Sequence, residues 1–146
     1  VTRMINMGIE PFLIASSVDL VSAQRLVRKL CGACKSPYTP DGELRKSLGL
    51  TGGGELTFYR FKGCPQCRNT GFSGRTAITE LFEMKPAILD LIMKGASAEE
   101  LREQAREMGM RTLWEDGIKK VKEGITTLEE ILRVTGAEPA LEKERV

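Results

Sequence analysis

Apolar positions recur at helical spacing through the second half of the chain. After Ser97, Thr112 and Thr127, large apolar residues return every three or four positions, which is the period of one helix face. A glutamate also stands three residues after each of these positions, a spacing typical of the reciprocal capping arrangement at a helix start. The three segments end at glycines, which are common helix stops: Gly109, Gly124 and Gly136. The pattern predicts three capped helices.

A fourth helix is expected between Pro86 and Gly95, because proline is favoured in the first turn of a helix and Ile88, Leu89 and Ile92 follow at helical spacing. The second half of the chain therefore predicts a small helical unit. Its single tryptophan, Trp114, lies on an apolar helix face and is expected in the core. Residues 137–146 are rich in charge and predict a flexible tail.

The first half of the chain has mixed signals. Residues 56–61 (LTFYRF) and 75–82 (RTAITELF) are rich in β-branched and aromatic residues and predict strands. Residues 18–30 (VDLVSAQRLVRKL) are compatible with either a strand or a helix, because short apolar runs do not separate the two. Strands in the first half and helices in the second predict the α+β fold class.

Composition indicates an ordinary globular protein. The chain has 146 residues, of which 41% are hydrophobic and 29% charged, enough for one average domain or two small ones. It contains no run of eighteen apolar residues, and its first residues lack the pattern of a secretory signal. We therefore expect a cytoplasmic protein, in which paired cysteines are more often ligands or redox groups than structural disulfides.

Charge is unevenly distributed. Residues 1–80 contain eleven Lys and Arg against six Asp and Glu, whereas residues 81–146 contain eleven against fourteen. The basic surplus of the first part is compatible with nucleic acid but common in other proteins. No nucleic-acid partner is expected from it.

The four cysteines form two identical spacings, CGAC and CPQC, and the chain has no histidine. Two CxxC segments can complete a tetrahedral four-sulfur shell around Zn²⁺. The spacing predicts a structural zinc site made of Cys31, Cys34, Cys64 and Cys67, with no open position for a substrate. Buried free thiols, dithiol redox chemistry and an iron–sulfur cluster are the alternatives.

Three segments carry a resemblance to a known family. The runs TRMINMGIEPFLIASS, QRLVRKLCGAC and GCPQCRNTGFSGRTAITELFEM resemble the carboxy-terminal part of the type II secretion and type IV pilus assembly ATPases (GspE/PilB-like), and the resemblance extends to about Gly136. It implies four regions: residues 1–30 as the last helix and strand of a RecA-like ATPase domain, 31–72 as a tetracysteine zinc subdomain, 73–136 as a returning strand plus a small helical subdomain, and 137–146 as the flexible tail.

No nucleotide-hydrolysing motif is present in the chain. A P-loop needs G-x-x-x-x-G-K-[ST], but Gly52–Gly54 is followed by Glu55, so we interpret these glycines as a hairpin tip. The acidic Walker B segment and the histidine box of the family are also absent. We therefore assign no catalytic and no cofactor-binding residue, and we expect this chain alone not to hydrolyse ATP.

The resemblance implies a function for the full-length parent. That parent would bind ATP and Mg²⁺, form a hexameric ring of neighbouring ATPase subunits, and associate peripherally with inner-membrane secretion or pilus platform proteins without inserting into the membrane. This chain would be a structural and coupling module. The alternatives are a dithiol redox protein and a free-standing zinc module that binds nucleic acid through Arg60, Lys62 and Arg68.

Three further arginines are candidates for function. Arg25 and Arg28, three positions apart, suit contacts to a neighbouring subunit or to nucleotide phosphates, although a solvated face is favoured. Arg75, next to a glycine turn, is expected either to bridge the zinc subdomain to the ATPase core or to begin an exposed strand.

Overall fold

The structure is a computed structural model of the chain, and it describes residues 1–48 and 56–136. The interpretation of Gly52–Gly54 as a hairpin tip and of residues 137–146 as a flexible tail falls outside these residues. In the part described, no helix has both the length and the apolar character needed to cross a membrane.

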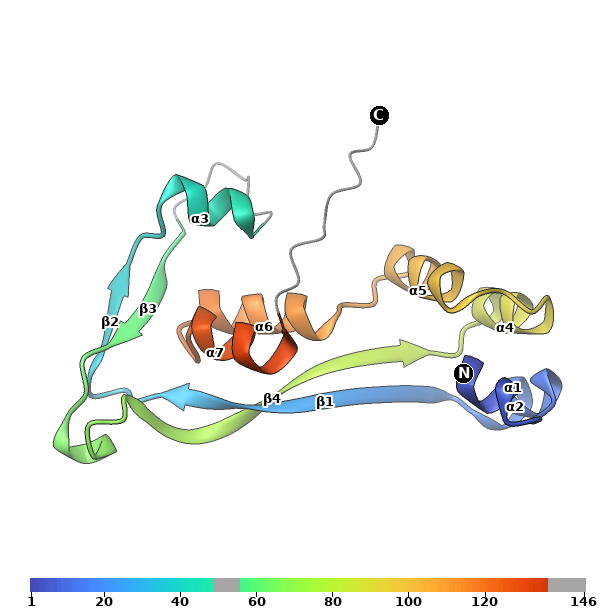
Figure 1. The fold of residues 1–146 in the computed structure, drawn as a ribbon, viewed down its shortest axis with the longest axis horizontal. Coiled ribbons are helices and arrows are strands. Elements are labelled where there is room, and N and C mark those ends of the chain that lie inside the picture. Colours follow the sequence, from blue (N-terminus) through green and yellow to red (C-terminus); the bar gives the residue numbers. More distant parts are fainter. Residues whose placement is uncertain (49–55, 137–146) are drawn as a thin grey trace. The chain divides into compact units, whose positions relative to one another are not determined.

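The described residues form an α+β fold, as predicted (Figure 1). The helices are α1 (Thr2–Asn6), α2 (Pro11–Ser17), α3 (Gly42–Ser47), α4 (Pro86–Met93), α5 (Ala98–Glu107), α6 (Leu113–Lys122) and α7 (Leu128–Thr135), with a 3₁₀ turn, η1, at Pro65–Cys67. The strands are β1 (Leu20–Leu30), β2 (Lys35–Tyr38), β3 (Phe58–Phe61) and β4 (Phe72–Glu83).

The strands make two small sheets. β1 pairs with β4, and the two long strands run in opposite directions in Figure 1. β2 pairs antiparallel with β3, with Lys35 opposite Phe61 and Tyr38 opposite Phe58. The strands expected at 56–61 and 75–82 are confirmed as β3 and β4, and the ambiguous segment 18–30 forms strand β1.

The chain divides into two compact units, each built from two separate segments. Unit one contains residues 1–23 and 79–112, and unit two contains residues 24–78 and 113–146. Helices α4 and α5 therefore belong to unit one, whereas α6 and α7 belong to unit two. The boundaries at residues 30, 72 and 136, and the RecA-like origin of residues 1–30, stay predictions.

Unit one has a small core between α4 and α5. Ile88 and Ile92 of α4 are buried against Leu101 and Ala105 of α5. Several large apolar side chains of this unit remain exposed instead: Met7, Phe12, Leu13, Leu20, Val21, Leu81 and Met93. Burial of apolar surface stabilises a fold by about 25 cal/mol per Å², so these side chains add little to unit one.

Unit two has the larger core, which joins strands and helices. Trp114 of α6 is 3% exposed, which confirms the prediction that it is a core residue. Its cluster includes Val27 of β1, Phe58 of β3 and Ile131 of α7. Helices α6 and α7 therefore share their core with the strands on either side of the cysteine segments.

The predicted cap of α5 forms as the sequence indicated, and the predicted cap of α7 forms in part. Ser97 accepts a hydrogen bond from the Glu100 N–H at 3.2 Å, and the Glu100 carboxylate accepts one from the Ser97 N–H at 2.7 Å. Helix α6 begins directly after Thr112, as expected. At α7 the Thr127 hydroxyl accepts from the Glu130 N–H, but the Glu130 carboxylate is bonded to two arginines instead of returning to the cap.

Candidate metal centre

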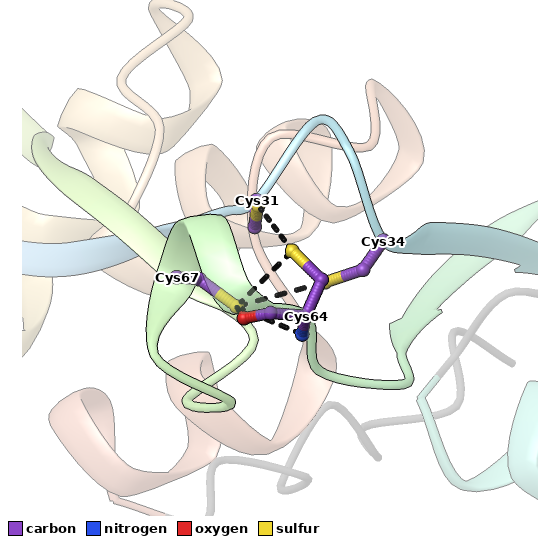
Figure 2. Close-up of side chains that lie close together, drawn as sticks. All are labelled: Cys31, Cys34, Cys64 and Cys67. Atoms are coloured by element: carbon purple, nitrogen blue, oxygen red, sulfur yellow. Dashed lines mark hydrogen bonds between the residues drawn. The ribbon is translucent and has the colours of Figure 1, made fainter.

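The four cysteines lie at one end of each sheet of unit two. Cys31 and Cys34 occupy the connection between β1 and β2, and Cys64 and Cys67 occupy the connection between β3 and β4. Because β2 pairs with β3, and β1 with β4, the two connections come together. Figure 2 shows the four side chains pointing toward one another.

The sulfur atoms have the spacing of a single tetrahedral ion site. All four lie within 4.8 Å of one another, and the Sγ–Sγ distances are 3.8 Å for Cys31–Cys64, 3.9 Å for Cys34–Cys67 and 3.7 Å for Cys64–Cys67. Four sulfurs arranged tetrahedrally about an ion with bonds of ~2.3 Å are separated by about 3.8 Å. The arrangement can therefore hold one metal ion. A multi-iron cluster would need its thiolates further apart.

Local backbone geometry turns the second CxxC segment around the site. Arg68 and Asn69 have φ of +52° and +60°, the left-handed conformation that few residues other than glycine, Asn and Asp adopt readily. This turn lets the Asn69 N–H donate to the Cys64 carbonyl at 2.9 Å. It also aims the Gly71 N–H at the Cys67 Sγ atom, 3.2 Å away.

Backbone hydrogen bonds also join the two CxxC segments. The Cys31 N–H donates to the Gly71 carbonyl at 2.9 Å, and the Lys62 N–H donates to the Cys34 carbonyl at 3.2 Å. Each segment is thus tied to the residues that flank the other. The site is assembled by the fold and not only by a bound ion.

The thiols have unequal acidity. Burial raises the pKa of the Cys67 thiol, but N–H groups of Cys64 and Gly71 directed at its sulfur outweigh burial and lower that pKa to about 6. Burial raises the pKa of the Cys34 thiol to about 11. A bound cation favours the thiolate form of every ligand. A bound metal would therefore keep all four cysteines in the thiolate form.

Gly71 provides a local test of this geometry. Its φ is +78°, and a β-carbon added there would overlap the ring of Phe61. We expect Gly71→Ala to lower the free energy of unfolding of the metal-loaded chain by about 2–4 kcal/mol, through left-handed strain and overpacking together. Urea unfolding measures the change.

The matched control for Gly71→Ala is Gly74→Ala. Gly74 has φ of +75°, but nothing lies within 4 Å of a β-carbon added there, so only the conformational cost of about 1–2 kcal/mol applies. Equal losses for the two variants would contradict the proposed packing of Phe61 on Gly71.

A second polar cluster in unit two was not predicted as such. Glu130, whose side chain is fully buried, accepts hydrogen bonds from the Arg28 N–H at 3.0 Å, from the Arg28 side chain at 2.7 and 3.0 Å, and from the Arg133 side chain at 2.7 and 3.0 Å. The sequence marked Glu130 as a capping residue and favoured a solvated face for Arg28. Arg28 is exposed, in line with the favoured solvated face, and its guanidinium also donates to this buried carboxylate in the same chain.

The other highlighted arginines lie on the surface. Arg25 is exposed, and its side chain donates to the Gln24 carbonyl at 3.1 Å. Arg75 lies inside β4 and is exposed. The possible bridge from Arg75 to an ATPase core stays a prediction.

Lys35 connects the metal-site hairpin to the turn between α6 and α7. Its Nζ atom donates to the Gly124 carbonyl at 3.0 Å and lies 5.0 Å from the centre of the Tyr59 ring. The Leu30 N–H likewise donates to the Ile125 carbonyl at 2.8 Å. These contacts hold the α6–α7 turn beside the residues that enter and leave the first CxxC segment.

Comparison with known proteins identifies the family. The family model described as "Type II/IV secretion system protein" matches residues 1–133. Type II secretion system ATPase E of Vibrio cholerae is 48% identical over 139 residues, which cover 92% of this chain and 27% of that protein. Type II secretion system protein E of Pseudomonas aeruginosa is 45% identical over 138 residues, covering 94% of this chain and 27% of that protein.

The similarity also includes a pilus protein. Type IV pilus assembly ATPase PilB of Thermus thermophilus is 45% identical over 139 residues, covering 92% of this chain and 15% of that protein. This chain thus spans about a quarter or less of the length of these relatives. The resemblance that the sequence motifs indicated is confirmed, and the chain belongs to the type II/IV secretion system protein family.

Proposed function

We propose that this chain is the zinc-binding and helical carboxy-terminal region of a cytoplasmic ATPase that powers protein secretion or pilus assembly. The observation that carries the proposal is the four-sulfur site within a chain that matches this family over residues 1–133. The family match favours this function over a free-standing nucleic-acid module or a dithiol redox protein.

In this proposal Cys31, Cys34, Cys64 and Cys67 hold one structural Zn²⁺, which supplies a fixed tetrahedral link between the two CxxC segments. All four positions are then filled by protein sulfur, and none is left for a water or a substrate. The residues around the site position the ligands and the hairpin. Backbone N–H groups of Gly71 and Cys64 point at Cys67, and Lys35 fixes the hairpin to the α6–α7 turn.

ATP and Mg²⁺ would bind in another part of the full-length parent, because this chain contains no P-loop sequence. In this proposal residues 1–30 are the end of a RecA-like domain, and the zinc site makes unit two rigid enough to transmit movement from that domain. The movement would be transmitted to neighbouring subunits of a ring and to inner-membrane platform proteins. The parent would be peripheral at the inner membrane through those partners.

The test replaces two ligands, one from each CxxC segment, in the full-length parent. We expect Cys31→Ser with Cys64→Ser to leave ATP binding intact but to reduce platform-stimulated ATP hydrolysis, together with secretion or pilus assembly, by about tenfold or more, the size of typical coupling between sites. Bound zinc is measured in the same preparation.

The matched control is Gln66→Ala, which changes an exposed residue in the same CxxC segment without removing a ligand. It is expected to behave as the unchanged parent does. Full stimulated hydrolysis and assembly in a double variant that is free of metal would overturn the coupling role.

A further inference from the structure

Unit two has a second concave site, outside the cysteine cluster. A pocket of about 350 Å³ is lined by residues of β1, β3, β4 and α7. Its chemistry comes from three arginines, two phenylalanines and one buried glutamate: Arg28, Arg60, Arg133, Phe61, Phe72 and Glu130. Pockets of this size with a few convergent polar groups are typical of binding sites.

Glu130 fixes the direction of two of the arginines. The Nε and Nη2 atoms of both Arg28 and Arg133 donate to its buried carboxylate. Among the described residues, the Nη1 atom of each guanidinium has no acceptor, and the two side chains are 48% and 59% exposed. A buried carboxylate therefore holds two forked donor groups in place at the surface before any ligand arrives.

Arg60 adds a third cation. Its guanidinium lies 5.8 Å from the centre of the Tyr38 ring, and no carboxylate in the described part of the chain pairs with it. The exposed Glu129 is the one acidic side chain of the pocket besides Glu130. The pocket thus contains three guanidiniums and two carboxylates, one of which is buried and already bonded. The resulting surplus of positive charge is complementary to a ligand with few negative charges.

The pocket also offers aromatic surface. Phe61 is 41% exposed although it is a large apolar side chain, and its ring centre lies 4.9 Å from that of Phe72. The Arg28 guanidinium lies over the Phe72 ring, 4.1 Å from its centre. Exposed aromatic and arginine side chains together are the composition of the energetic centres of protein–protein interfaces.

From these contacts we propose that the pocket binds a segment of a partner protein that presents an acidic side chain next to an apolar one. The carboxylate bonds the free Nη1 atoms of Arg28 and Arg133 and the guanidinium of Arg60, and the apolar side chain covers Phe61. A nucleic acid fits less well, because the exposed Glu129 of the pocket repels a chain of phosphates. The proposal goes beyond the ATPase function and does not depend on it.

The test uses random twelve-residue peptides displayed on phage, selected on the zinc-loaded chain. We expect enriched peptides to carry Asp or Glu within two positions of a large apolar residue. A synthetic copy of one such peptide should bind about tenfold more weakly to Arg60→Gln, because one charge-assisted hydrogen bond is lost. Arg60 makes no ion pair within the described residues, so this variant is expected to fold normally.

The matched control is Arg75→Gln, which removes an exposed arginine of the same unit outside the pocket. It should change the dissociation constant by less than about twofold. A peptide in which Gln replaces the acidic residue should lose binding. Arg133→Gln is a second pocket variant, and it should also weaken peptide binding, as Arg60→Gln does. Thermal unfolding checks that this variant is folded.

Three outcomes would overturn the proposal. One is the absence of any enriched peptide. Another is an enriched peptide that binds Arg60→Gln and Arg75→Gln equally well. The third is a single-stranded twelve-nucleotide DNA whose binding depends on Arg60 while acidic peptides do not bind, which would assign the pocket to nucleic acid.

Discussion

Removal of the metal is expected to unfold the β2–β3 hairpin and to expose Trp114 to water. Each strand of this hairpin has only four residues, and an isolated two-stranded hairpin is marginal in water. Structural zinc supplies ~10–16 kcal/mol of apparent binding free energy, as much as the ~5–15 kcal/mol by which whole domains are stable. Loss of the ion therefore removes a large part of the support of the hairpin and leaves it with its core contacts through Phe58.

Trp114 reports this change because it is the single tryptophan and shares a core with Phe58 of β3. We expect one zinc per chain by elemental analysis, and a red shift of tryptophan emission after treatment with a chelator. Cys31→Ser with Cys64→Ser should show the shifted emission without chelator, and Gln66→Ala should not. Unchanged emission and thermal stability in metal-free protein would show that zinc does not support this fold.

Glu130→Gln is expected to be the most destabilising single substitution outside the cysteines. The change removes the anion that accepts from Arg28 and Arg133, and because hydrogen bonds to charged groups contribute about 1.5–3 kcal/mol each, we expect a loss of about that size or more. Glu129→Gln is the matched control, since Glu129 is the adjacent residue but is exposed, and surface substitutions usually change stability by less than about 0.5 kcal/mol. Urea unfolding of the zinc-loaded chain measures both, and equal effects would contradict the role of Glu130.

The same carboxylate gives a pH dependence with a definite sign. Burial raises the pKa of Glu130, but hydrogen bonds from Arg133 and Arg28 outweigh burial and lower that pKa to about 2, below the ordinary value of ~4.3. Its stabilising effect is complete above the ordinary value and is lost as the pH falls from there toward 2. Acid also releases zinc, so the measurement is the difference in stability between the unchanged chain and Glu130→Gln, which should shrink over this range.

Local patterns were enough to predict most elements and the cysteine site. Ser97 caps α5 and the strands β3 and β4 lie where the sequence indicated, because capping and alternation depend on residues close in sequence. The cysteine cluster was predictable because each CxxC segment has local meaning and no other cysteines compete for pairing.

Several features that sequence patterns missed depend on distant residues, whereas helix α3, with its local Asp41 cap, was missed although its signal is local. Glu130 stands three residues after Thr127, so its position fits a capping box, while its actual partner Arg28 lies 102 residues away. The segment 18–30 is a strand because β4 pairs with it, which no short window can indicate. The helical subdomain expected within residues 73–136 stays a prediction, and the contacts of α6 and α7 with Val27 and Phe58 lie within unit two.

The interleaved order of the two units has a consequence for synthesis on the ribosome. Unit one is complete once residue 112 has been made, and the first segment of unit two, residues 24–78, lies between its two segments in the sequence. Unit two must wait for α6 and α7, and Glu130 is added ~5–20 s after Arg28 at usual elongation rates. Once Cys67 has been made within that interval, all four thiols are present without the helices that complete their unit. A stop codon after Thr112 would therefore leave every residue of unit one while removing half of the core that supports the metal site.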